Sequence, residues 1–562
     1  MVMVQRSIHT GGIACRCCSR RWIRRPRHDQ SSGDGTIGPM TGTVFVLMFG
    51  VCLFLCGCGC DRDGPSADGK TGGKVAAQPP PKPMLDGWKK PAVAIVLSGE
   101  LHGYLEPCGC SATQSGGLSR RADLFRQLAA RDWPVTAVDL GGLVKRTRVQ
   151  SRYKFETIGQ DYTEIGYRAI GLGPEELRLG ADYLISRQPP EPDAAGSPPL
   201  LISANLIFYG TPDLGVPARF RVIDVGGKSI GVTAVFGKSL KDNVFLRGAQ
   251  GDITFVDPVK SLATVIDELK KRKVDLLVLL AQAELKESRE LARRFPELNL
   301  ILSAGGPEDP DGKPEQIGRT MLVTTGHKGK YVGIVGFYPD DAKTPLRFEL
   351  VDLDKFRFQN TPGIDNRMRE YQKRLADFAS QVMKDVPAGP HPSGSRFTGV
   401  ETCRRCHTKA YAVWKTTKHA QAYESLKTGR KDQKTRWISR IRDPECLACH
   451  VVGWNPELLS RYDSGFIIRE LSGDHPQRYS LLQGQQCENC HGPGSRHVEL
   501  ETLWNQDRSK TTLEAVVALR KQVHRSKETA ERMVCARCHD LENSPHFDFQ
   551  KYWKDVEHKG RD

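Results

Sequence analysis

The pattern Cys-x-x-Cys-His occurs four times in the last third of this 562-residue chain. The copies are Cys403/Cys406/His407, Cys446/Cys449/His450, Cys487/Cys490/His491 and Cys535/Cys538/His539. Two thiols three positions apart can both reach the vinyl groups on one edge of a porphyrin, and the histidine that follows supplies an axial nitrogen to the iron. Structural zinc sites also use Cys-x-x-Cys pairs, but they do not require a histidine directly after every second cysteine. The repeats therefore predict four covalently bound haem c groups, each with one proximal histidine.

Further histidines supply candidates for the opposite side of each iron. They are His391, His419, His475, His497, His524, His546 and His558. Methionines are few in this region, and Met533 lies too close in sequence to Cys535 to fold back easily. Because imidazole suits iron, we expect bis-histidine ligation, which predicts lower reduction potentials than His/Met ligation.

The first 60 residues have the pattern of an export signal. Residues 43–55 are continuously apolar, which is too short to span a bilayer comfortably and suits the core of a signal peptide. Leu55-Cys-Gly-Cys58 follows and resembles a bacterial lipobox, with Cys58 as the lipidated residue; Cys60, or an ordinary cleaved signal, is the alternative. We therefore expect an exported protein of the periplasm or cell envelope, held at the membrane by a lipid anchor on Cys58.

The formal net charge of the chain is +16. A basic surface suits acidic redox partner proteins or anionic lipid headgroups. The sequence carries no nucleic-acid-binding motif, so we expect redox partner proteins and no nucleic acid.

The chain predicts five successive segments, of which residues 1–60 are the first. Residues 61–91 are rich in Gly, Pro, Lys and Asp, which predicts a flexible linker. Residues 92–360 alternate short apolar runs with helical patterns, which is typical of an α/β layered fold. Residues 361–396 contain an expected helix, 367–385, and a Pro/Gly-rich linker, 386–395. Residues 397–562 show no clear strands and predict a mainly α domain whose core is packed with porphyrins.

Individual elements are expected within the α/β segment. The expected strands are 92–97, 135–140, 200–204, 220–225, 229–236, 274–280, 298–303, 321–325 and 331–337, and the expected helices include 118–130, 259–273 and 285–295. Strands interleaved with helices in this way favour layers of sheet and helix.

The haem segment resembles the tetrahaem cytochrome c-554 family from about Thr398 to His558. The matching text is Trp414-Lys-Thr-Thr-Lys-His419-Ala-Gln-Ala422, Cys487-Glu-Asn-Cys-His-Gly-Pro-Gly-Ser-Arg-His497 and the tail from Ser544 to His558. The resemblance implies that His419, His497 and His558 are distal axial ligands. It does not assign them to particular haems, because in such folds a distal histidine often serves a haem other than its neighbour in sequence.

Three distal candidates for four haems leave the haem at Cys446/Cys449 undecided. The resemblance allows a five-coordinate haem there, whose open iron would bind a small nitrogen species such as nitric oxide, hydroxylamine or nitrite. Alternatively, His475 or His524 closes the sixth position.

Residues 92–340 resemble the metallophosphatase domain of bacterial 5′-nucleotidases. The segments that carry the resemblance are Ser98–Pro107, Gly116–Leu118 and Ile202–Asn205. The resemblance implies a metallophosphatase-like α/β fold for this segment.

The metal ligands of that family are largely missing here. Glu100 replaces its first aspartate, although His102 remains. Gly141-Gly142 replaces Gly-Asp, Gly173-Pro-Glu-Glu176 replaces Gly-Asn-His-Glu, and Ser303–Pro307 replaces the His-x-His pair. A dinuclear site needs about six N or O ligands. We therefore expect no dinuclear metal site and no metal-dependent phosphoester hydrolysis.

Cys108 and Cys110 are the remaining candidate catalytic residues. Two thiols with one residue between them can form a strained, easily reduced disulfide or bind a soft metal ion. His102 is near enough in sequence to tune a thiolate. The alternative is a structural disulfide that pins a loop.

These features together predict an exported multihaem cytochrome that transfers electrons through four haems. Two alternatives stay open. One is an oxidoreductase that acts on a small nitrogen species at an open haem, and the other is thiol redox catalysis at Cys108/Cys110 coupled to the haems.

Overall fold

The structure of the protein is a computed structural model. It describes residues 82–107, 114–189, 191, 194, 196–245, 251–429, 437–540, 544 and 547–558, all within one compact unit, Gln78–Asp562. The expected signal peptide and lipobox, most of the expected linker 61–91, and Cys108 and Cys110 lie outside the described residues. None of the helices that the structure describes is long and apolar enough to cross a lipid bilayer.

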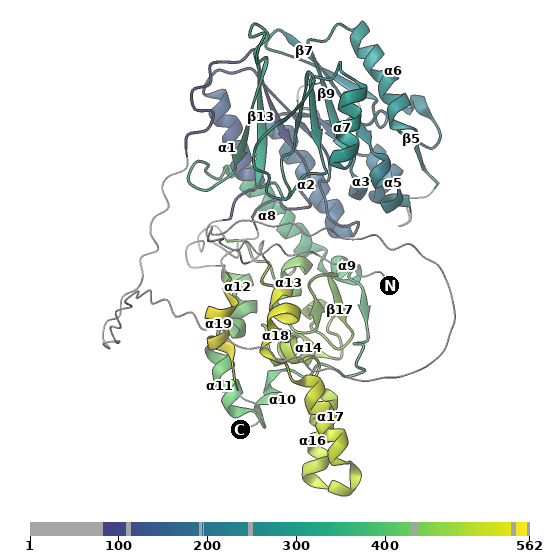
Figure 1. The fold of residues 1–562 in the computed structure, drawn as a ribbon. Coiled ribbons are helices and arrows are strands. Elements are labelled where there is room, and N and C mark those ends of the chain that lie inside the picture. Colours follow the sequence, from purple (N-terminus) through teal and green to yellow (C-terminus); the bar gives the residue numbers. More distant parts are fainter. Residues whose placement is uncertain are drawn as a thin grey trace, which may run out of the picture. The chain divides into compact units, whose positions relative to one another are not determined.

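Two six-stranded sheets make up the α/β part of the chain (Figure 1). The first has the order β14 (Leu346–Asp352), β13 (Tyr331–Phe337), β1 (Val93–Ser98), β2 (Val135–Asp139), β3 (Tyr167–Gly171), β4 (Leu200–Ile202). The second has the order β11 (Glu315–Ile317), β12 (Thr320–Val323), β10 (Leu300–Ser303), β9 (Leu276–Gln282), β7 (Lys228–Phe236), β6 (Phe220–Val225). A separate pair joins β5 (Leu206–Phe208) and β8 (Ile253–Phe255). In the first sheet β1 to β4 are parallel, and the antiparallel strands β13 and β14 lie on one side only. In the second sheet the parallel centre is flanked on both sides, by antiparallel β11 and β6.

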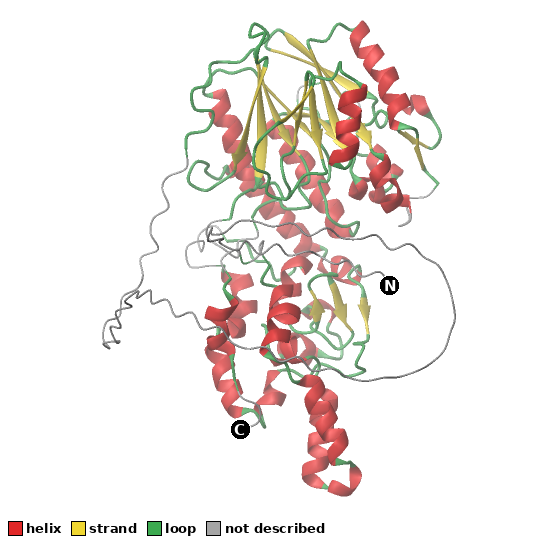
Figure 2. Ribbon diagram, in the orientation of Figure 1, coloured by secondary structure: helices red, strands yellow, loops and turns green. Residues whose placement is uncertain are grey.

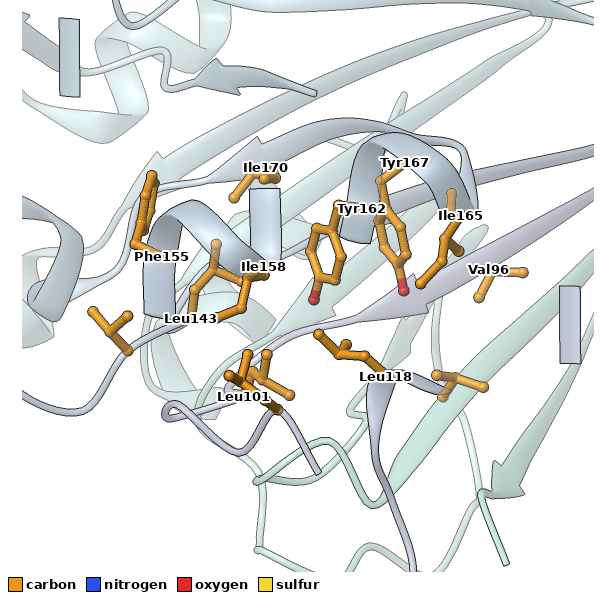
Figure 3. Packing of buried hydrophobic residues seen from close by; sticks show 14 of the residues in the cluster. Val96, Leu101, Leu118, Leu143, Phe155, Ile158, Tyr162, Ile165, Tyr167 and Ile170 are labelled. Carbon is orange, nitrogen blue, oxygen red and sulfur yellow. The ribbon is translucent and has the colours of Figure 1, made fainter. Parts of the chain in front are cut away.

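The sheets pack face to face and each carries helices on its outer side. Because successive side chains of a strand point to opposite faces, Val93, Ile95 and Leu97 of β1 join Val278 and Leu280 of β9 in one buried cluster. The other face of the first sheet packs against α1 (Leu118–Ala129), α2 (Val149–Ile165) and α8 (Pro362–Asp377), as Figure 3 shows for part of this cluster. The outer face of the second sheet packs against α6 (Pro258–Lys271) and α7 (Leu285–Arg294). The result is a four-layer sandwich, which confirms the α/β layered fold.

This part also has four shorter helices, α3 (Pro174–Leu179), α4 (Ala181–Ile185), α5 (Lys238–Phe245) and α9 (Ala379–Lys384).

Two elements of the first sheet and one long helix were not among the expected ones. Strand β14 is an edge strand whose residues are mostly half-buried, so its apolar signal is weak. Strand β3 follows α2 directly through Gly166, which takes the left-handed conformation at φ 102°, and no run of turn residues separates the two. Helix α2 buries Gln150, Lys154 and Asp161 along with its apolar residues, so it has no clean apolar stripe from which a helix can be predicted.

The C-terminal part is mainly helical, as expected, and Figure 2 shows few strands there. Its helices are α10 (Val400–Arg404), α11 (Thr408–Thr416), α12 (Ala422–Thr428), α13 (Pro444–His450), α14 (Pro476–Ser480), α15 (Cys487–His491), α16 (Ser495–Gln506), α17 (Leu513–Val523), α18 (Lys527–Thr529) and α19 (Phe549–Val556). The expectation of no strands after residue 397 is wrong in one detail. Strands β16 (Trp454–Asn455) and β17 (Ser460–Tyr462) form a small sheet with β15 (Ala388–Gly389), because the chain reverses at Leu459 with φ 47°.

A buried polar network ties α1 and α2 to the ends of β1 and β2. The Arg121 guanidinium, 1% exposed, donates hydrogen bonds to the hydroxyls of Ser98, Tyr162 and Tyr167 at 3.1, 2.8 and 3.2 Å. The carboxylate of Asp139 accepts from Tyr162 at 2.7 Å. The rings of Tyr162 and Tyr167 stack with centroids 4.0 Å apart (Figure 3). Arg121 and the fully buried Asp139 interact electrostatically and are linked through the hydroxyls of Ser98 and Tyr162.

We expect Arg121→Met to destabilise the fold by about 3–5 kcal/mol, because removing one partner leaves the other charge buried and unpaired. The measurement is the free energy of unfolding of the full chain in urea, followed by circular dichroism. The matched control is Arg289→Met, which breaks the solvent-exposed pair with Glu315 and should change that free energy by about 1 kcal/mol at most. Equal effects of the two variants would contradict this account of the network.

Candidate haem sites

Each attachment motif is wound into a helical turn. The amide of His407 donates to the carbonyl of Cys403 at 3.0 Å, and the amide of His539 donates to that of Cys535 at 2.8 Å. Helices α13 and α15 contain the second and third motifs entirely. Because residues three and four apart share a helix face, both thiols and the imidazole of a motif lie on one side of its turn.

All eight motif cysteines are exposed or half-buried. Cys406 is exposed, and Cys449 and Cys538 are half-buried. The attachment of haem to these residues stays a prediction from the motifs.

Three pairs of histidine rings face each other across motifs. The ring centroids are 6.3 Å apart for His407 and His497, 6.0 Å for His539 and His419, and 5.7 Å for His491 and His558. Two imidazoles that bind one metal ion from opposite sides, each at about 2 Å, have centroids roughly 6 Å apart. The three pairs therefore fit the bis-histidine ligation of an iron porphyrin.

The three ring pairs also show which distal histidine faces which proximal histidine, a question that the sequence left open. His497 follows the third motif but faces the proximal histidine of the first. His419 follows the first motif but faces that of the fourth, and His558 at the end of the chain faces that of the third. Each predicted distal histidine is thus brought to a motif distant in sequence.

Hydrogen bonds at Nδ1 leave Nε2 available for the metal. The Nδ1 atoms of His450, His491 and His558 lie 2.6, 2.8 and 2.8 Å from the carbonyl oxygens of Ala422, Val523 and Val556. A carbonyl only accepts, so Nδ1 of each ring carries a proton, and in the neutral tautomer this leaves the lone pair on Nε2.

Burial lowers the pKa of several of these rings below the usual histidine range. The affected histidines are His419, His450, His491, His497 and His539. A lower pKa favours the neutral imidazole, which is the form that ligates metals.

His450 differs from the other proximal histidines. No ring contact in the described part of the chain pairs it with a second imidazole, although its Nδ1 bond to Ala422 is the shortest of the set. His475 stands at the start of α14 and His524 at the end of α17, and neither ring contacts His450. His391 instead packs against Tyr462, with ring centroids 4.7 Å apart.

The strand ends of the α/β part hold a small polar cluster. The Nε2 atom of His102 lies 3.1 Å from a carboxylate oxygen of Glu100, and the side chain of Gln282 donates to the other oxygen at 2.8 Å. The ring of His327 meets His102 edge-on, with centroids 5.4 Å apart. Glu100, His102 and Lys328 all take left-handed φ angles, of 51°, 49° and 63°, and such strain gathers at functional sites. His327 was not among the predicted site residues, and its only sequence signal is its place after the apolar strand β12.

Glu176 has a structural role beside this cluster. Its carboxylate accepts amide hydrogen bonds from Gly142, Leu143 and Gly173 at 2.9, 2.8 and 2.9 Å. Burial raises its pKa to about 7. Gly142 has a left-handed φ of 72°, and a Cβ there would lie 2.8 Å from a carboxylate oxygen of Glu100, so a side chain at this position would strain the backbone and displace that carboxylate. Within the residues that the structure describes, no group of three or more Cys, His, Asp or Glu side chains is placed to hold a metal ion.

Comparisons with known proteins match both parts of the chain. Residues 402–492 match the family model described as "Cytochrome c554 and c-prime". The chain is 33% identical over 104 residues to cytochrome c-554 of Nitrosomonas europaea, which covers 17% of this chain and 39% of that protein. It is 23% identical over 218 residues to a 5′-nucleotidase of Diplobatis ommata, which covers 37% of this chain and 36% of that protein.

Among solved structures, the crystal structure of a 5′-nucleotidase precursor from Thermus thermophilus aligns with a TM-score of 0.43 and 23% identity, over 53% of this chain and 61% of that one. This chain spans under two-fifths of the length of the two curated relatives. Both resemblances drawn from the sequence are confirmed: the C-terminal part of the chain is similar to cytochromes c-554, and its N-terminal half is similar to 5′-nucleotidases.

Proposed function

We propose that this protein is a multihaem c-type cytochrome that transfers electrons through four haems bound at the Cys-x-x-Cys-His motifs. The observation that supports it most is the set of three imidazole pairs with centroids 5.7–6.3 Å apart. When bound, haem c supplies one-electron chemistry between ferric and ferrous iron. The residues of the chain hold it through eight thiols and four proximal imidazoles, and ligate it a second time through His419, His497 and His558.

The spacing of the motifs supports transfer between neighbouring haems. The side chain of Cys403 in the first motif lies close to that of Cys487 in the third. The side chain of Cys490 in the third motif lies close to that of Cys535 in the fourth. The third motif therefore lies close to both the first and the fourth, which favours electron transfer between the haems attached to these motifs.

The proposed setting is the cell envelope. The apolar run 43–55 and the lipobox-like Cys58 support export and lipid anchoring, and the positive net charge supports an acidic redox partner.

A second candidate function is an oxidoreductase activity on a small nitrogen species at the second motif. The observation that favours it is His450, which no other imidazole faces in the described part of the chain. An iron ligated by His450 alone would keep one position open for such a ligand. Thiol redox catalysis at Cys108 and Cys110 stays a prediction from the sequence, because these residues lie outside the described ones.

We expect His558→Ala to convert one low-spin ferric signal into a high-spin one, because the imidazole facing His491 is removed. The measurement is electron paramagnetic resonance of the purified ferric protein. The matched control is His391→Ala, which removes a ring that packs on Tyr462 and should leave every signal in place. An unchanged spectrum for His558→Ala would contradict the proposed ligation.

We expect the double variant Cys446→Ser/Cys449→Ser to lose the high-spin ferric signal of the wild-type protein and to keep the low-spin ones. The same high-spin signal should shift in the wild type when nitric oxide is added. A wild-type spectrum without high-spin iron would rule out the second candidate function and leave electron transfer alone.

A further inference from the structure

Side chains of the α/β part form hydrogen bonds and ion pairs with the helix that carries the second motif. Asp443 caps the N-terminus of α13, with its side chain accepting from the amide of Glu445 at 3.0 Å. The same carboxylate accepts from Gln150 at 2.8 Å and from Gln372 at 2.9 Å. Asp443, Gln150 and Gln372 are 5%, 5% and 4% exposed. A buried cap bonded from three sides fixes where α13 begins.

A mostly buried ion pair lies one residue before the first cysteine of this motif. The ammonium of Lys154 lies 2.6 Å from one carboxylate oxygen of Glu445, and the guanidinium of Arg146 lies 3.3 Å from the other. The side chain of Lys154 is 9% exposed. Its ammonium also donates to the carbonyl of Gly103 at 2.8 Å. One cation therefore joins the loop of His102 to the first turn of α13.

Both contacts come from one face of helix α2. Gln150 and Lys154 are four residues apart, so they project side by side. Gln150 reaches Asp443 and Lys154 reaches Glu445. These contacts with the C-terminal part account for the burial of Gln150 and Lys154 on α2.

The charges around Cys446 are balanced by the α/β part. The nearby cations hold the pKa of Glu445 below its usual range despite burial, so this carboxylate is ionised. Arg440, which pairs with Glu106 from the loop after β1, interacts electrostatically with Cys446. A charge held close to an iron site in a medium of low dielectric constant changes the free energy of adding an electron there, and a positive charge favours the reduced state.

We propose that Lys154 is a positioning residue through which the α/β part sets the reduction potential of the haem at Cys446/Cys449. The inference rests on the proposed function, since it requires a haem at this motif. Lys154 neutralises Glu445 and thereby raises the potential of that haem. The α/β part is in this way an electrostatic regulator of one haem, and the contact is made by α2 and the loop after β1.

The test uses the full-length, haem-loaded protein and a pair of variants with opposite charge changes. Lys154→Met removes a positive charge and should lower the potential of this haem, whereas Glu445→Gln removes a negative charge and should raise it. Lys154→Arg keeps the positive charge and should leave the reduction potential at the wild-type value. The potential of this haem is obtained by spectroelectrochemical titration, as the difference from the Cys446→Ser/Cys449→Ser double variant. The control is Lys238→Met, which breaks an exposed pair with Asp257 and should leave the potential unchanged.

Opposite shifts of the two variants support the proposal, because a merely structural contact would not reverse sign with charge. Equal-sign shifts, or none, in variants that retain their full haem content would overturn it while leaving the proposed function intact. If Lys154→Met does not fold, Glu445→Gln must still raise the potential on its own. Wild-type protein without bound haem would instead refute the proposed function itself.

Discussion

In the proposed cytochrome, the outer helices of the C-terminal part depend on the facing imidazoles of His407/His497, His419/His539 and His491/His558. Each pair joins segments that are far apart in sequence. Helix α11 begins directly after His407, and helix α16 contains His497, yet neither helix has a buried residue. Apolar packing of the chain alone therefore does little to hold these helices, and shared metal ligation between their ends is the interaction that fits their arrangement.

The sequence predicts the attachment sites because covalent chemistry demands a fixed local spacing, which is visible without a structure. It does not predict which distal histidine faces which motif, because that depends on the path of the chain between residues such as His407 and His497. Helix α2 was missed for a related physical reason. Two of its buried polar residues, Gln150 and Lys154, are hydrogen-bonded to Asp443 and Glu445, and Glu445 lies 291 residues further along the chain than Lys154. No local pattern therefore explains them.

The strand ends and loops of the α/β sandwich make contacts within the chain. Glu176 accepts hydrogen bonds from backbone amides, and the loop after β1 contributes Gly103 and Glu106 to contacts with the C-terminal part. The sequence predicted the fold from alternating strands and helices, whereas the expected absence of a dinuclear metal site stays a prediction. The use of this edge to hold α13 emerges only from the contacts of Lys154 and Gln150.

The intact mass of the purified mature protein tests the central claim most directly. Attachment through the eight cysteines predicts a mass increase of four haems over the polypeptide, which survives denaturation because the links are covalent. A mass equal to that of the polypeptide alone would contradict the whole account.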